Sequence, residues 1–115
     1  MVNNYNNISK EYGVLTERIK ENLPLKAYPV PEFVEGFKKT GNQITLKTEM
    51  KIINVHNGGE LIGILCTALL NNGLKISCSL THLDFPTSTI LYNEITAYQI
   101  KRIARVKIIM AAQHN

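Results

Sequence analysis

The chain has 115 residues, of which 44% are hydrophobic and 19% are charged. This length predicts one domain that spans residues 1–115, and the composition excludes an intrinsically disordered chain. The formal net charge is +4 at pH 7. This basic character is local, because four of the five basic residues after residue 60 lie between Lys101 and Lys107.

The longest apolar stretch, Leu61–Leu70, has ten residues, about half of the roughly 20 that a membrane helix needs. The N-terminal residues lack the basic and apolar regions of a secretory signal. We therefore expect a cytoplasmic protein that makes no membrane contact. Cys66 and Cys78 belong to no CxxC pattern, so we expect free thiols and no metal site.

Apolar residues at helical spacing predict an N-terminal helix from about Asn7 to Asn22, which Pro24 ends. A seam of about two and a half heptads is too short for a coiled coil on its own, so we expect this helix to dock on the core. After an extended linker, a second, short helix is expected to begin at Pro31 and to stop at Gly41.

Three segments then have the pattern of strands: residues 43–52, 61–70 and 74–83. Asn57-Gly58 and Asn72-Gly73 separate them, and both pairs are typical of two-residue hairpin turns. A long helix follows Pro86 and extends to about residue 113. The predicted fold is therefore α+β, a three-stranded antiparallel meander packed by an N-terminal and a long C-terminal helix, in the order α-α-β-β-β-α.

The strand register depends on the length of the second turn. With two-residue loops, apolar residues of the three strands share one face, and Cys66 and Cys78 fall on opposite faces. A three-residue loop at Asn71–Gly73 would instead place the two cysteines directly opposite each other. That register leaves leucines beside Lys75 and Ser79, so we expect the first and keep the second as the alternative.

Cys78, His82 and Asp84 lie close together in the sequence and raise the question of a catalytic set. On a straight strand, Cys78 and His82 are about 13 Å apart, which is too far for a nucleophile and its base. His82 and Asp84 remain candidate catalytic residues. In the alternative interpretation, His82 fills the space opposite Gly63, and Asp84 caps the turn before Pro86.

A basic, aromatic-bearing face of the C-terminal helix is the candidate nucleic-acid-binding surface. Its residues are Tyr98, Lys101, Arg102, Arg105 and Lys107. Cations on one helix face suit phosphate contacts. The alternative is a solvated helix whose long basic side chains lie over apolar surface.

The central strand carries an apolar stripe on what the expected register makes its outer face. The stripe, our candidate interface, consists of Ile62, Ile64, Cys66, Ala68 and Leu70. Such a stripe is either covered by a helix or shared with a partner, in which case the chain would form a homodimer or bind another protein.

No phosphate-binding loop, HExxH, GxSxG or EF-hand pattern occurs in the sequence. We therefore expect no cofactor, and a non-enzymatic binding, regulatory or adaptor module that acts through protein contacts. The alternatives are a nucleic-acid-binding module that uses the C-terminal helix, and a small enzyme with its site at His82 and Asp84.

Overall fold

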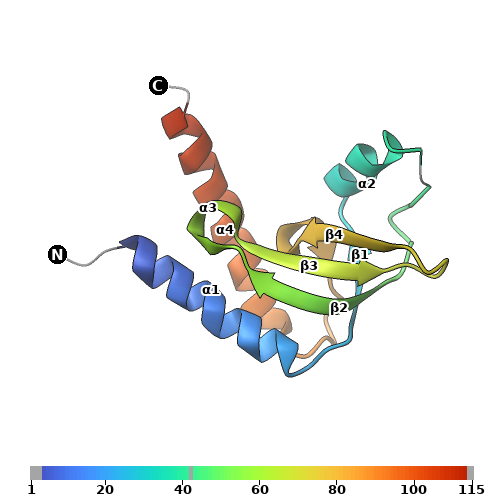
Figure 1. Ribbon diagram of the computed structural model, residues 1–115, viewed down its shortest axis with the longest axis horizontal. Helices are drawn as coiled ribbons and strands as arrows, with labels where there is room; N and C mark the ends of the chain where they lie inside the picture. The colour runs from blue at the N-terminus through green and yellow to red at the C-terminus, as the bar shows by residue number, and fades with distance from the viewer. Residues whose placement is uncertain (1–3, 42, 114–115) are drawn as a thin grey trace.

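The computed structural model describes residues 4–41 and 43–113, with side chains from Ile8 onward. These residues form an α+β fold with a curled antiparallel sheet (Figure 1). The helices are α1 (Asn4–Lys20), α2 (Pro31–Lys38), α3 (Gly59–Ile62) and α4 (Tyr92–Gln113), with a 3-10 turn η1 (Leu80–His82). The strands are β1 (Leu25–Pro29), β2 (Met50–Asn57), β3 (Ile64–Leu69), β4 (Lys75–Ser79) and β5 (Leu83–Asp84). No helix in the described part of the chain combines the length and apolar character needed to cross a bilayer.

The sheet has the order β4-β3-β2-β1-β5, so the predicted count of three strands is wrong for the described residues. The predicted linker before α2 is extended, but it pairs on both sides, with β2 and with β5. Prolines around such a segment argue against a strand because proline donates no backbone hydrogen bond. Here Pro29 is the last residue of β1, where this missing donor is tolerated.

The first predicted strand, at residues 43–52, is displaced toward the C-terminus, because β2 begins only at Met50. Before it, Thr45 and Thr48 close a turn: the Thr48 N–H donates to the Thr45 carbonyl at 3.0 Å, and the Thr45 N–H donates to Thr48 Oγ1 at 2.8 Å. Threonine side chains that bond to nearby backbone compete with strand pairing. The alternation of apolar and polar residues at positions 45–48 therefore belongs to a turn and not to a strand.

The expected hairpin turn at Asn57-Gly58 is also wrong, because α3 lies between β2 and β3. The Gly59 N–H donates to Asn57 Oδ1 at 2.9 Å, and the Gly58 N–H donates to the Gly63 carbonyl at 2.8 Å. Gly59 and Gly63 have φ angles of +88° and +82°, which favour glycine. These bonds close a compact helical turn in place of a type I′ hairpin.

The register between β3 and β4 is the one that we expected less, because Cys66 pairs directly with Cys78. Both cysteines are buried and free. Leu65 and Leu69 do lie opposite Ser79 and Lys75, but these leucines are only half-buried. A half-buried face accepts mixed neighbours, so the polar pairs do not oppose this register.

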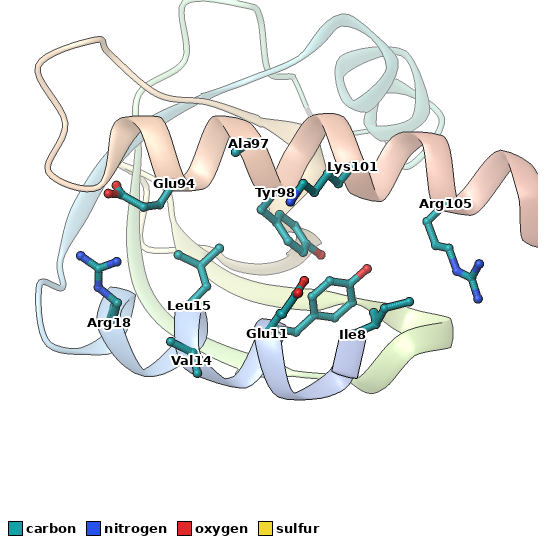
Figure 2. A pocket seen from close by; sticks show the side chains of 11 residues that line it. Ile8, Glu11, Val14, Leu15, Arg18, Glu94, Ala97, Tyr98, Lys101 and Arg105 are labelled. Atoms are coloured by element: carbon teal, nitrogen blue, oxygen red, sulfur yellow. The ribbon is translucent and has the colours of Figure 1, made fainter. Parts of the chain in front are cut away.

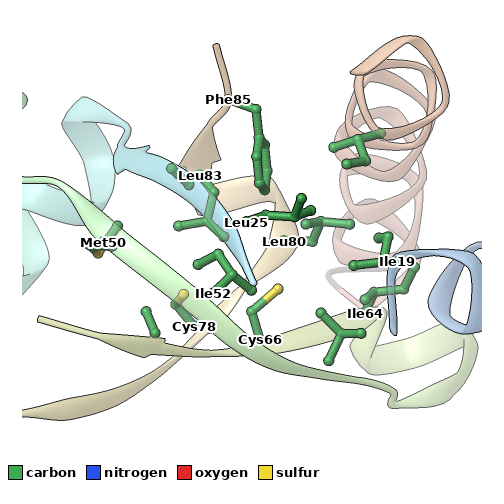
Figure 3. Packing of buried hydrophobic residues seen from close by; sticks show 14 of the residues in the cluster. Ile19, Leu25, Met50, Ile52, Ile64, Cys66, Cys78, Leu80, Leu83 and Phe85 are labelled. Carbon is green, nitrogen blue, oxygen red and sulfur yellow. The ribbon is translucent and has the colours of Figure 1, made fainter. Parts of the chain in front are cut away.

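The core lies between the sheet, α1 and the first half of α4 (Figure 3). Four members of the apolar stripe on β3 are buried in it: Ile64, Cys66, Ala68 and Leu70. The fifth, Ile62, lies on α3 and is exposed. Of the two alternatives for the stripe, coverage therefore holds for these four residues, and they form no accessible interface.

Three further hydrogen bonds attach the start of α2 and the first half of α4 to η1 and the start of β5. The Val30 N–H, just before α2, donates to the His82 carbonyl at 3.0 Å. Gln99 Nε2 donates to the carbonyls of Leu80 and Leu83 at 2.9 and 2.7 Å. These bonds hold the first half of α4 against the rest of the protein, whereas its last turns extend away from the sheet and the other helices (Figure 1).

Candidate functional site

A groove of about 520 Å³ lies between α1 and α4 (Figure 2). The two helices run in opposite directions along it, with Arg18 near Glu94 at one end and Ile8 near Arg105 at the other. Its lining is mainly apolar or aromatic: Ile8, Tyr12, Val14, Leu15, Ala97 and Tyr98. Charged side chains of both signs flank it: Glu11, Arg18, Glu94, Lys101 and Arg105.

The spacing of residues on the two helices explains why an apolar groove remains open to solvent. On α1, Tyr12 and Ile19 enter the core, while Leu15 points into the space between the helices (Figure 2). Val14 is 57% exposed. On α4, Ala97 and Lys101 are four residues apart and share the face that lines the groove.

The groove floor is an aromatic pair. The rings of Tyr12 and Tyr98 meet edge to face, with centroids 5.0 Å apart. The Ile64 N–H, at the start of β3, donates to Tyr98 Oη at 2.8 Å. Burial raises the pKa of Tyr98 to about 12, so the hydroxyl stays protonated at neutral pH and anchors the floor to the sheet.

Beside this floor, Arg102 is buried and joins α4 to α3. Its guanidinium donates to the carbonyls of Glu60 and Leu61, the latter at 2.8 Å, and lies 5.8 Å from the centre of the Tyr12 ring. The next turn of α4 adds an ion pair between Arg105 Nε and Glu60 Oε1. A buried cation needs such partners, because leaving it unpaired in the interior is costly.

Gly63 is the position that allows this arrangement. A Cβ there would lie 2.7 Å from Arg102 Nε and 2.8 Å from Tyr98 Oη, so a side chain would displace both groups. Glu60 and the backbone carbonyls of α3 could not be identified from the sequence as partners of Arg102 and Arg105. The two glycines that flank residues 60–62 were the only local signal, and the Asn-Gly pair before them favoured a hairpin.

The structure does not bring the five candidate nucleic-acid-binding residues together on one accessible face. Tyr98 and Arg102 are buried, and Arg105 is paired with Glu60. Lys101 and Lys107 are exposed. The basic stretch of the sequence is therefore divided between internal bonding and solvent.

His82 and Asp84 are both exposed, in η1 and β5. The His82 ring lies 5.6 Å from the Phe33 ring of α2, measured between centroids. Arg102 and Tyr98 occupy the space at Gly63, so the alternative interpretation in which His82 fills that space is wrong. A hollow beside α2 is lined by Cys78 and His82, among others, but not by Asp84.

Burial raises the pKa of Cys78 to about 11. Its side chain is therefore a neutral thiol at pH 7, whereas catalysis by cysteine requires the thiolate. In the described part of the chain, no three His, Cys, Asp or Glu side chains gather as metal ligands would. No protein-family model, curated protein or solved structure matches this chain.

Proposed function

We propose that the protein is a non-enzymatic binding module whose α1–α4 groove takes an amphipathic helix of a partner protein. The observation that carries this proposal is the apolar lining between two antiparallel helices, with Leu15 and Tyr98 pointing into the space between them (Figure 2). Binding of an amphipathic helix in an apolar groove is a recurring mode of peptide recognition.

The length of the groove sets the size of the ligand. Its lining residues extend from Ile8 to Arg18 on α1 and from Glu94 to Arg105 on α4, about 15 Å at 1.5 Å per residue. A helix of three turns fits this length and would present apolar residues at positions i, i+4 and i+7. Glutamates and basic residues at the rim fix the orientation of such a helix, because each attracts the opposite charge.

Selection from a displayed library of helical peptides, each of about 15 residues, tests the proposal. Peptides that bind the wild type should share the i, i+4, i+7 apolar pattern. Val14→Glu should weaken their binding by about tenfold or more, because it places a charge within the apolar lining. Val14 is already exposed, so this variant should still fold.

The matched control is Ile90→Glu, which changes an exposed isoleucine in the loop before α4, outside the groove lining. It should leave peptide affinity unchanged. Peptides without a helical pattern, or affinity that is equal for wild type and Val14→Glu, would contradict a helix-binding groove.

A nucleic-acid-binding role is the second proposal, and it now depends on Lys101 and Lys107, the exposed members of the basic stretch. Two phosphate contacts give only a shallow salt dependence, whereas six to ten contacts give a loss of about 10³–10⁵ in affinity between 50 and 200 mM salt. Titration with mixed-sequence oligonucleotides separates the two roles. Tight binding that Lys101→Glu/Lys107→Glu abolishes would favour nucleic acid over a helical peptide.

A further inference from the structure

Charged side chains on the two rims of the α1–α4 groove face each other with opposite signs. The α1 rim carries Glu11 and Arg18, and the α4 rim carries Glu94 and Lys101. Figure 2 shows Arg18 opposite Glu94 at one end of the groove and Glu11 opposite Lys101 nearer its middle. We call these four residues the rim quartet.

The spacing within each rim suits a helical ligand. On both rims the glutamate precedes the basic residue by seven positions, which is about two helical turns and about 10.5 Å along the axis. A step of seven residues also returns a side chain to nearly the same side of a helix. One bound helix can therefore meet both charges of a rim with its own residues i and i+7.

The rim quartet is free to bind charges from outside. Its four side chains are exposed, and no salt bridge in the described part of the chain involves them. Across the groove, Leu15 and Tyr98 lie between the two rims (Figure 2). Arg105, the fifth charged residue of the lining, is already paired with Glu60. Four charges therefore remain for a ligand.

The order of charges is crossed between the rims, because α1 and α4 run in opposite directions along the groove (Figure 2). Each pair of facing residues consists of one acid and one base. A ligand with a single sign of charge on both flanks would meet as many like charges as opposite ones. Electrostatic attraction at all four positions requires an acidic and a basic residue on each flank, in the reverse order on the two flanks.

We infer that the partner helix carries both signs of charge beside its apolar stripe, with acids next to Arg18 and Lys101 and bases next to Glu11 and Glu94. This inference rests on the proposed helix-binding groove and names the chemistry of its partner. The apolar lining supplies affinity for any amphipathic helix. The rim quartet selects among such helices, because a wrong partner places like charges together.

Three peptides built on the apolar stripe of one library-selected helix test the inference. The matched peptide has glutamate and lysine at the four flank positions in the crossed order, the reversed peptide has each glutamate and lysine exchanged, and the neutral peptide has glutamine at all four. The crossed order is unchanged when the helix is turned end for end, so one peptide is matched in both directions.

Fluorescence anisotropy with labelled peptides measures their affinity for the wild type. The matched peptide should bind at least about tenfold more tightly than the reversed peptide, with the neutral peptide between them, because eight modest changes in exposed ion pairs add together. Raising the salt concentration from about 0.1 M to about 1 M should remove most of this difference, because salt screens exposed charges. The affinity of the neutral peptide should not fall.

Exchanging the charges of the rim quartet should reverse the preference. The variant Glu11→Arg/Arg18→Glu/Glu94→Lys/Lys101→Glu keeps the net charge of the chain. All four positions are exposed, so circular dichroism should show the helix content of the wild type. This variant should bind the reversed peptide about tenfold more tightly than the matched peptide, and it should bind the neutral peptide as the wild type does.

The control variant is Glu35→Lys/Lys38→Glu, which exchanges the charges of an exposed ion pair on α2, outside the groove lining. It also keeps the net charge, and it should retain the preference of the wild type for the matched peptide. A control that loses this preference would show that the effect does not come from the rims, and would overturn the inference.

The remaining outcomes separate this inference from the proposed function. Equal affinity of the wild type for the three peptides would overturn the inference and leave a helix-binding groove that does not read charge. If the library yields no helical peptide, the proposed function and the inference fail together. A wild type that sediments as a dimer, with Val14→Glu as a monomer, would also overturn the inference, because a second copy would then occupy the groove.

Discussion

The hydroxyl of Tyr98 offers a sharp test of how α4 is attached to the sheet. Replacing Tyr98 by Phe removes one oxygen and keeps the ring that packs edge to face on Tyr12. The change leaves the N–H of Ile64, a fully buried residue, without the acceptor that it has at 2.8 Å. An unpaired buried donor costs about 1–3 kcal/mol.

We expect Tyr98→Phe to lower the free energy of unfolding by about 2 kcal/mol, and the melting temperature by about 8 °C. Tyr12→Phe is the matched control. Tyr12 is equally buried, but its hydroxyl has only a contact of 3.5 Å with Arg102, at the limit of a hydrogen bond. Its loss should cost under about 1 kcal/mol. Urea denaturation followed by circular dichroism measures both; equal effects of the two substitutions would refute the reasoning.

The same hydroxyl has a signature in the pH dependence of stability. Burial raises the pKa of Tyr98 from its ordinary value of 10.0 to about 12 in the folded protein. Between these values the unfolded chain loses the proton and the folded chain keeps it, so the free energy of unfolding falls as the pH rises. The Tyr98→Phe variant has no hydroxyl at this position to ionise, so its free energy of unfolding should not show this fall. The difference in stability between wild type and Tyr98→Phe should therefore narrow from pH 10 to 12, and a constant difference would contradict the assignment.

Three further outcomes follow from the buried contacts. Gly63→Ala should destabilise the fold by more than about 2 kcal/mol in urea denaturation, because the added Cβ would meet the groups that hold α3 to α4. The control is Gly73→Ala, whose Cβ would meet open space. It should cost only the ~1 kcal/mol of its left-handed φ. Burial raises the pKa of Cys66 and Cys78, so a thiol reagent should label them only after unfolding, and rapid labelling of the native protein would contradict their burial. The free energy of unfolding should fall from pH 9 to 11, because the thiols of the unfolded chain ionise first. Gln99→Leu should cost about 1–3 kcal/mol, because the Leu83 carbonyl loses its amide donor and the Leu80 carbonyl keeps only the Leu83 N–H. A neutral result in thermal denaturation would show that water replaces the amide.

The helices were predictable because their signals are local. Apolar spacing places the N-terminal helix before Pro24, and the structure has α1 end at Lys20. The long C-terminal helix was also confirmed, as α4. In both, a stripe of side chains repeats within a few turns, so the residues that specify the helix lie inside it.

The register and the site depended on contacts between distant residues. Asn57-Gly58 has the composition of a hairpin turn, but Asn57 ends β2 and Gly58 caps α3, and the bonds to Gly63 close that helix in place of a hairpin. The backbone acceptors of Arg102 lie 41 and 42 positions earlier in the chain, and the basic stretch itself gives no sign of them. A sequence shows where a charge is located, but its partner depends on the tertiary structure.

The strand order also bears on how the chain assembles. β2, β3 and β4 are neighbours in sequence and can pair through short connections. The last seam, between β1 and β5, joins Tyr28 to Asp84, 56 positions apart, through two residue pairs, one of which includes Pro29. Closing so long a loop costs chain entropy before its few contacts form. We therefore expect the curled sheet to form from its local hairpins and to close at the β1–β5 seam last, and the backbone amides of this seam should exchange readily with solvent.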